Sequence, residues 1–300
     1  MFIIYVDISK NTTEQIHSTG KPYIVSLSGL CLEHNIQMLE KIAEAPEGIA
    51  AIELNVACPN VPNKPMIAYD FDQLETVLNR ITSMAQFSRL PPIGLKLAPY
   101  FDMPHFERVA MLISKYPIKF IVCVNTIGNG LVVDWENECE GMAAKSGLGG
   151  IGGGFIKHTA LANVRMFYKL LNDKYARPDI DIIGVGGVHS GRDAFELILC
   201  GAKAIQVGTC HWTEGSSCFE RISKELEEIM KSKGYKSIDD FRGKLKPYIR
   251  SSNNNKSTKA STVGADTKTE TTANESLINP LNAILILIIA VLLAKEFFMK

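Results

Sequence analysis

The densest group of chemically active side chains lies in the segment Asn55–Pro65. Asn55 and Asn60 bracket Cys58, and three prolines that follow the cysteine indicate a loop after a strand. An asparagine amide offers donors and an acceptor, which suit the edge of a planar amide or imide ring. A cysteine beside such a ring can act as a general base or nucleophile, although most cysteines are small buried hydrophobes. We therefore predict that Cys58 is catalytic and that both asparagines bind substrate.

Two further polar features stand at the ends of apolar runs. Lys96 lies inside the run Ile93–Leu97, and Asn125 and Thr126 end the run that starts at Phe120. Burying an unpaired ammonium costs several kcal/mol, so Lys96 must face a ligand or partner; the alternative is a lysine that reaches the barrel rim. We predict that Lys96 points inward to a ligand, and that Asn125 and Thr126 place an amide and a hydroxyl at the end of a strand.

Glycines near the end of the sequence suggest a phosphate site. Gly186 and Gly187 follow one apolar run, and Gly208 and Thr209 follow the next. Glycines after the last two strands of a barrel leave backbone N–H groups bare, which suits a phosphorylated ligand. The glycine-rich run Gly147–Gly154 is interpreted as a flexible loop, because no Gly-Lys-Ser/Thr follows it. The histidines are scattered without metal-ligand spacing, so no metal site is predicted.

The elements that would position these residues alternate between short apolar runs and helical patterns. Continuous apolar runs are typical of parallel strands that are buried on both faces, and alternation with helices predicts an α/β fold. The chemically active residues fall at the carboxyl ends of these strands, which favours a TIM (β/α)₈ barrel over a doubly wound sheet. The expected strands are Tyr23–Gly29, Ala51–Cys58, Ile93–Ala98, Phe120–Thr126, Ile180–Val188 and Ala204–Gly208, and the expected helices are Leu32–Glu44, Asp72–Ala85, Met103–Lys115, Thr159–Leu171, Gly191–Cys200 and Gly215–Lys233.

Six strands are fewer than the eight of a complete barrel. We therefore expect an incomplete barrel within residues 1–250, with unpaired edges at Tyr23–Gly29 and Ala204–Gly208. Residues 251–276 are rich in Ser, Thr, Asn and Lys and predict a disordered polar linker. Residues 277–300 contain the apolar run Ala283–Ala294, which predicts a C-terminal hydrophobic helix that anchors the chain to a membrane.

The net charge and the cysteine content indicate which partners and which cellular compartment to expect. The formal net charge is zero, so nothing indicates a nucleic-acid partner. Seven cysteines without a CxxC pair favour a reducing compartment. We expect a protein that faces the cytoplasm on its membrane anchor, or a soluble cytosolic protein if the tail is not part of the product.

Taken together, these blocks resemble the class 1A dihydroorotate dehydrogenase family. The resemblance runs from about Lys21 to Lys246, and it rests on the Asn55–Pro65 loop, Ala68–Phe71, Pro99–Asp102, Asn125–Leu131, Gly147–Gly153, Thr159–Val164 and Gly234–Ser237. It implies an FMN-dependent barrel enzyme of pyrimidine (UMP) synthesis that oxidises dihydroorotate to orotate. It also implies a homodimer that reoxidises its flavin with fumarate, which yields succinate.

The resemblance assigns a role to each candidate residue. Cys58 would remove the C5 proton of dihydroorotate, and Lys96 would lie near N1 of the flavin and stabilise its reduced anion. The pyrimidine and its carboxylate would be held by Asn55, Asn60, Asn125 and Thr126. The FMN phosphate would be bound by Gly186, Gly187, Gly208 and Thr209.

The sequence also departs from the family. Ala57 and Thr126 stand where the family usually has serine, and the two strands that usually precede Tyr23, with their Lys-Ser pair and Asn-Met-Gly loop, are expected to be missing. Two alternatives therefore remain open. One is an inactive, membrane-tethered pseudoenzyme or interaction protein. The other is a flavin-dependent oxidoreductase that acts on a related pyrimidine such as uracil.

Overall fold

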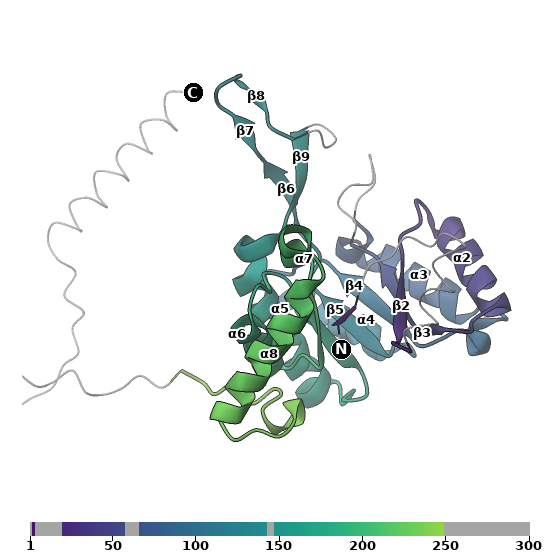
Figure 1. The fold of residues 1–300 in the computed structure, drawn as a ribbon. Helices are drawn as coiled ribbons and strands as arrows, with labels where there is room; N and C mark the ends of the chain where they lie inside the picture. Colours follow the sequence, from purple (N-terminus) through teal and green to yellow (C-terminus); the bar gives the residue numbers. More distant parts are fainter. Residues whose placement is uncertain (1, 4–19, 58–65, 143–146, 249–300) are drawn as a thin grey trace, which may run out of the picture. The chain divides into compact units, whose positions relative to one another are not determined.

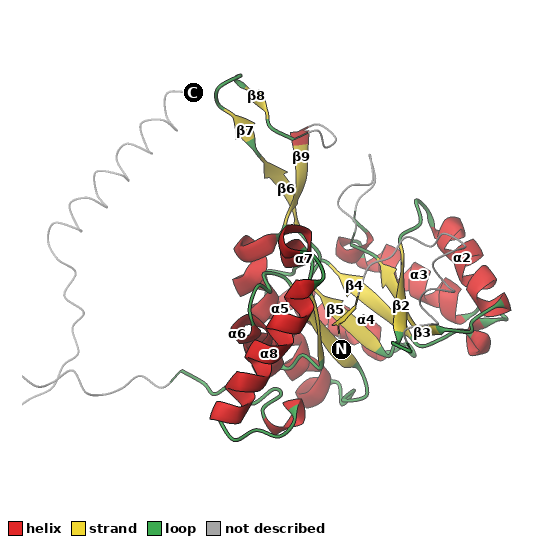
Figure 2. Cartoon of the chain, viewed as in Figure 1, coloured by secondary structure: helices red, strands yellow, loops and turns green. Residues whose placement is uncertain are grey.

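The chain folds around a parallel sheet of seven strands in order β1-β11-β10-β5-β4-β3-β2. Figure 2 labels strands β2, β3, β4 and β5 of this sheet. The computed structural model describes residues 2–3, 20–57, 66–142 and 147–248, and its helices and strands all lie in the unit Met1–Pro247. The strands are β1 (Phe2–Ile3), β2 (Tyr23–Leu27), β3 (Ile49–Asn55), β4 (Ile93–Leu97), β5 (Phe120–Cys123), β10 (Asp181–Val185) and β11 (Ala204–Gln206).

All six expected strands are present, and each ends earlier than predicted. β5 stops at Cys123 and β11 at Gln206, so Asn125, Thr126 and Gly208 lie in loops just past the strands. The seventh strand, β1, was not predicted. It pairs with β11 through Phe2 and Ile205 and through Ile3 and Gln206. The expectation that the Ala204–Gly208 strand has an unpaired edge is therefore wrong over these two residue pairs.

The helices follow from apolar periodicity and from side chains that cap their first turns. Asp70, Asp102 and Ser190 each accept a hydrogen bond from a backbone N–H of the helix that they precede, which offsets the unpaired donors there. The helices are α2 (Leu32–Glu44), α3 (Phe71–Thr82), α4 (Met103–Ser114), α5 (Lys157–Lys169), α6 (Gly191–Cys200), α7 (Thr209–Glu214) and α8 (Ser217–Ser232).

One short helix was not predicted. The predicted helix Gly215–Lys233 is present as α8, and the structure has the additional helix α7 before Gly215. Gly215 adopts a φ of 71°, in the left-handed region that glycine enters at little cost, so it breaks the helical path between the two. The sequence pattern missed α7 because the helix is short and follows the site residues directly.

The sheet curls so that strands far apart in its order face each other. Gln206 on β11 donates a hydrogen bond of 2.5 Å to Glu53 on β3, although β10, β5 and β4 lie between these strands in the sheet. A flat sheet would keep these side chains more than 15 Å apart at the usual strand spacing of about 4.8 Å. The sheet is therefore bent into the wall of a TIM-like α/β barrel.

The barrel interior holds an apolar cluster and a polar one. The apolar cluster contains Ile24, Ala51, Phe120, Val122 and Ile183. A Cβ on Gly94 would lie 2.3 Å from the Phe120 ring, so glycine there makes room for this aromatic ring. The polar cluster consists of Glu53, Lys96 and Gln206, which lie at or near the carboxyl ends of β3, β4 and β11.

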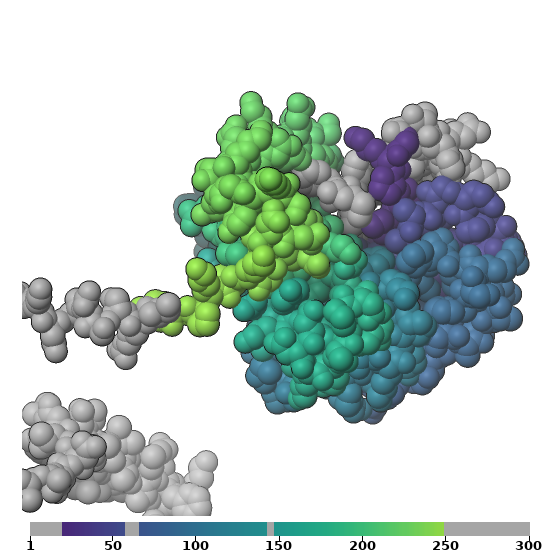
Figure 3. Space-filling model, turned by 90° about the horizontal axis from the view of Figure 1, so that it is seen from below, coloured from purple at the N-terminus to yellow at the C-terminus, as the bar shows by residue number. Residues whose placement is uncertain are grey.

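The larger apolar core lies between the outer face of the sheet and the helices. Fully buried side chains from both sides, such as Leu54 and Leu95 on strands and Leu74 and Phe167 on helices, belong to one cluster. In Figure 3 the blue segment that includes α3 and α4, the teal segment and the green segment that includes α8 adjoin one another on one face of the molecule. The helices thus hold the curled sheet, which positions the site.

The glycine-rich run is not a flexible loop, which corrects the interpretation of Gly147–Gly154. Residues Leu148–Ile151 form β9, which pairs antiparallel with β6 (Ile127–Leu131). Together with β7 (Val133–Asp134) and β8 (Cys139–Glu140) they make a ribbon that extends away from the barrel strands (Figure 1). Glycine is needed because the strand passes close to the site: a Cβ on Gly150 would lie 2.1 Å from the Thr126 hydroxyl oxygen.

The predicted C-terminal features lie outside the described residues. Both the linker at 251–276 and the hydrophobic helix at 277–300 fall there. Within residues 2–3, 20–57, 66–142 and 147–248, no helix is both long and apolar enough to cross a membrane.

Candidate active site

A cavity of about 220 Å³ opens at the carboxyl ends of β4, β5, β10 and β11. Seven of the ten predicted site residues line it, from segments more than 110 positions apart in the sequence: Lys96, Asn125, Thr126, Gly186, Gly187, Gly208 and Thr209. Its wall also includes Gly152, Gly153, Ile156 and His189, which the sequence analysis did not select. Parallel strands bring these loops together because their carboxyl ends share one edge of the barrel.

Glycines form one end of this cavity. Gly186 and Gly187 have φ angles of 125° and 70°, which residues other than glycine rarely adopt. A Cβ on Gly187 would lie 2.5 Å from Cβ of Lys157 and 3.1 Å from the carbonyl oxygen of Gly153. At Gly208 an added Cβ meets nothing within 4 Å, so that backbone faces open space. This end can receive a group that binds backbone N–H donors, such as a phosphate.

Polar side chains form the other end. Lys96 is 5% exposed, and its Nζ donates a hydrogen bond of 3.0 Å to Oε1 of Gln206. The same Nζ lies 3.7 Å from Oε1 of Glu53. Lys96 thus points into the barrel as predicted, but it also has buried partners that the prediction did not include. An ammonium held in this way gives the cavity floor a fixed positive group.

The asparagines are arranged by hydrogen bonds at the ends of β3 and β5. Asn125 Nδ2 donates to Asn55 Oδ1 over 3.2 Å, and Asn125 Oδ1 accepts from the Thr126 backbone N–H over 2.8 Å. Asn55 Oδ1 also accepts from the backbone N–H of Ala57 over 3.1 Å. These bonds fix the orientation of both amides, which a ring-binding site requires. Cys58 and Asn60 follow directly, but both lie outside the described residues.

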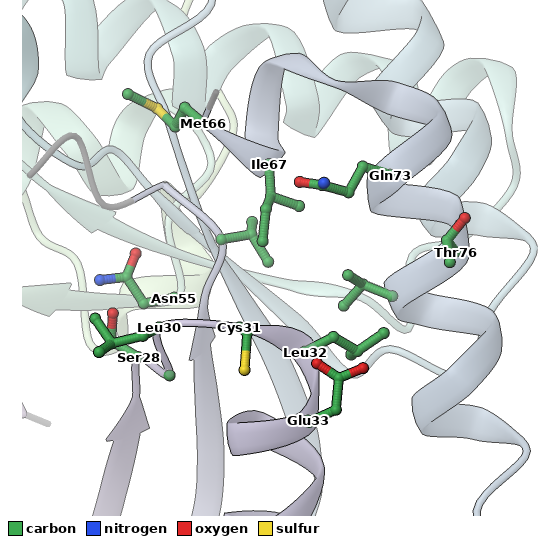
Figure 4. A pocket seen from close by; sticks show the side chains of 13 residues that line it. Ser28, Leu30, Cys31, Leu32, Glu33, Asn55, Met66, Ile67, Gln73 and Thr76 are labelled. Carbon is green, nitrogen blue, oxygen red and sulfur yellow. The ribbon is translucent and has the colours of Figure 1, made fainter. Parts of the chain in front are cut away.

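Asn55 belongs to a neighbouring cavity rather than to the first one. This second cavity, about 300 Å³, lies between the start of α2 and the side of α3 (Figure 4). Asn55 lies at its wall near Ser28 and Leu30, with Gln73 and Thr76 on the opposite side. The hydrogen bond from Asn125 to Asn55 connects the two cavities. The structure therefore brings Asn55, Asn125 and Thr126, three of the four candidate substrate residues, together at this boundary.

Two buried cysteines near the first cavity are poor bases. Burial raises the pKa of the Cys123 thiol well above its ordinary value, although the Lys96 charge opposes the shift. Burial, followed by a hydrogen bond to Glu214, raises the pKa of Cys210 to about 11. Both thiols are protonated near neutral pH, so neither provides a thiolate in place of Cys58.

Sequence reasoning missed two buried residues of the site, Glu53 and Gln206. A signal existed for Glu53, because a carboxylate inside the apolar strand Ile49–Asn55 raises the same question as Lys96 does in its strand. The register places Asn55 opposite Lys96 and Glu53 opposite Gly94, so the two charges lie on adjacent strands. Gln206 gives the same signal in the apolar strand Ala204–Gln206, but its partner could not be found from the sequence, since the contact depends on the curling of the sheet.

Comparison with known proteins agrees with this geometry. The family model described as dihydroorotate dehydrogenase matches residues 4–230. Dihydroorotate dehydrogenase A (fumarate) of Lactococcus lactis is 48% identical over 247 residues, which are 82% of this chain and 75% of the relative. Dihydroorotate dehydrogenase (fumarate) of Kluyveromyces lactis is 45% identical over 243 residues, or 81% of this chain and 73% of the relative.

Solved structures show the same fold. DHODH from Eimeria tenella, in its ligand-free form, gives a TM-score of 0.56 at 19% identity over 74% of this chain, and its complex with ferulenol gives 0.55. This chain spans 64% and 61% of the length of those two chains. Because the family model matches most of the sequence and relatives approach half identity, the chain belongs to the dihydroorotate dehydrogenase family.

Proposed function

We propose that this chain uses FMN to oxidise (S)-dihydroorotate to orotate in pyrimidine synthesis, with fumarate as the electron acceptor. One observation carries the proposal: a single cavity joins the glycine end, Lys96 and the oriented amide of Asn125. Fumarate appears in the names of the Lactococcus and Kluyveromyces relatives, and class 1A members are expected to reduce it to succinate.

The residues present fit FMN. Gly186, Gly187 and Gly208 would hold the phosphate with Thr209, because all four residues line the cavity and an added Cβ on Gly208 would meet only open space. Lys96, at the other end, would face the flavin ring and stabilise negative charge there. When bound, FMN would supply the acceptor for the hydride that leaves C6 of the substrate.

Two roles toward the substrate are proposed: four residues would bind it, and one would act as the base. Asn55, Asn60, Asn125 and Thr126 would hold the pyrimidine ring and its carboxylate through amide and hydroxyl groups. Cys58 would take the proton from C5 as the C5–C6 bond becomes double. Because Cys58 and Asn60 lie outside the described residues, these two roles rest on the sequence and the family alone.

For the finer architecture we propose a (β/α)₈ barrel to which β2, β3, β4, β5, β10 and β11 contribute six strands. Residues 1–250 would form this domain, 251–276 a linker and 277–300 a hydrophobic anchor helix, which remains a prediction because it lies beyond the described part of the chain.

We further propose that the ribbon joins two copies in a homodimer. Its apolar side chains are unusually exposed, with Trp135 at 79%, Val133 at 60% and Leu131 at 53%. Antiparallel strands with exposed apolar residues suit self-association about a twofold axis. Light scattering should give twice the chain mass, and Trp135→Glu should shift the protein toward monomer. A wild-type monomer at micromolar concentration would contradict the dimer.

Product analysis tests the reaction. Purified protein incubated with dihydroorotate and fumarate should form orotate and succinate in equal amounts, whereas dihydrouracil should give no product. Turnover of dihydrouracil but not dihydroorotate would favour the alternative pyrimidine substrate. Failure with both substrates, in protein that carries FMN, would favour a pseudoenzyme.

A further inference from the structure

Three polar side chains are packed in the barrel interior beneath the cavity. Lys96, Glu53 and Gln206 are 5%, 1% and 1% exposed, and they come from β4, β3 and β11. The Gln206 amide bridges the other two: Oε1 accepts from Lys96 Nζ at 3.0 Å, and Nε2 donates to Glu53 Oε2 at 2.5 Å. Ser26 on β2 donates to the other oxygen of Glu53 at 3.3 Å.

The distances show what the amide does. Lys96 Nζ lies 3.7 Å from Oε1 of Glu53, whereas a direct ammonium–carboxylate hydrogen bond is about 2.7–2.9 Å long. The ammonium is instead bonded to Gln206, which occupies one oxygen of the carboxylate with its own N–H group. The two opposite charges are therefore close enough to offset each other's desolvation but are held out of direct contact.

We propose that Gln206 is a positioning residue that spaces Lys96 from Glu53 and so holds the ammonium at the cavity floor. Without the amide, attraction across a low-dielectric interior would draw Lys96 onto Glu53. The ammonium would then turn away from the ligand, and its charge would be cancelled more completely. Gln206 needs no contact with the flavin for this role, and it is not among the residues that line the cavity.

The inference rests on the proposed function only where it concerns flavin, so the first test uses protein without flavin. In a crystal structure of the Gln206→Met variant, Lys96 Nζ should move from 3.7 Å to direct contact with Glu53. Methionine has a similar length and no hydrogen-bonding amide. If the variant does not fold, Gln206→Asn keeps an amide but is too short to reach both partners, and it should show the same movement. An unmoved Lys96 in either variant would overturn the proposal.

The second test measures the reduction potential of the bound flavin. Gln206→Met should lower the preference for reduced over oxidised flavin about tenfold, which is about 30 mV for a two-electron couple. In a Lys96→Met background the same substitution should change nothing, because Gln206 acts through the lysine. An equal shift in both backgrounds, or no shift in either, would contradict the positioning role.

A matched control separates positioning from folding. Asn163 is also a buried amide, 1% exposed, and it bonds to the backbone of Tyr100 and Thr159 on the outer side of the sheet. Asn163→Leu should lower the melting temperature but leave the flavin potential unchanged. A protein that binds no flavin at all would refute the proposed function, while the flavin-free crystal structure would still decide the role of Gln206.

Discussion

The first cavity is lined mainly by backbone at one end and by polar side chains at the other. At the glycine end, Gly186, Gly187 and Gly208 form the wall with backbone, and its shape depends on φ angles and on missing Cβ atoms. At the other end, Lys96 and Asn125 contribute side chains that are fixed by hydrogen bonds to Gln206 and Asn55. Glycines with a positive φ tolerate almost no substitution. At the side-chain end, by contrast, a single substitution can remove one charge or one hydrogen bond and leave the rest in place.

We therefore expect substitutions at the side-chain end to slow flavin reduction more than they weaken FMN binding. The largest effect is expected at Cys58, which follows Asn55 by three positions in the sequence. Cys58→Ala should keep FMN bound but slow flavin reduction by dihydroorotate about 10²–10⁴-fold, the loss typical of a general base. Stopped-flow absorbance measures this rate. A near-normal rate would remove Cys58 from the mechanism.

Lys96→Met should have the next largest effect. Loss of a charge that stabilises the reduced flavin should slow its reduction about 10²–10³-fold. The substitution also leaves Glu53 buried without its ammonium partner, which destabilises the fold. The double variant Lys96→Met/Glu53→Gln restores charge balance, so it should recover thermal stability without recovering the rate. Recovery of both would show that Lys96 is only structural.

Substitutions at the glycine end should weaken FMN binding rather than slow the reaction. A glycine with room for a Cβ can be distinguished there from one without such room. Gly208→Ala has room for its methyl group, so the flavin-free protein should keep its free energy of unfolding while FMN affinity falls about tenfold. Gly187→Ala, at a φ of 70° and against Lys157, should lose about 1–2 kcal/mol of stability as well. Denaturant unfolding and FMN titration give both quantities. Equal stability losses in the two variants would contradict the backbone account.

The smallest effect is expected at Thr126, which lines the cavity. Thr126→Val should raise the KM for dihydroorotate about fivefold, which corresponds to one lost hydrogen bond of about 1 kcal/mol. Thr126→Ser keeps the hydroxyl and should leave KM within twofold of the wild type. If both variants behave alike, the hydroxyl makes no bond to the substrate.

Much of this arrangement could be predicted from local patterns. Apolar runs located the six strands, and the rule that barrel sites gather at carboxyl strand ends placed Lys96, Asn125 and Gly187 at one cavity. The pattern failed where structure depends on distant pairing. The glycines of β9 resemble a loop in sequence, and only pairing with β6 makes them a strand.

The Gln206–Glu53 bond was beyond prediction for a related reason. It requires two strands separated by 153 positions to face each other across a curled sheet. Local propensity carries no information about such a contact, because neither residue is unusual in its own strand except for its polarity. Burial of polar groups therefore indicates that a partner exists without identifying it.

Anaerobic titration of the purified protein with dihydroorotate tests the central claim most directly. The account predicts that the protein carries about one FMN per chain, that stoichiometric dihydroorotate bleaches the oxidised flavin absorbance, and that fumarate restores it. The contradicting result is protein whose flavin is bleached by dithionite but not by dihydroorotate, or protein that neither carries nor binds FMN.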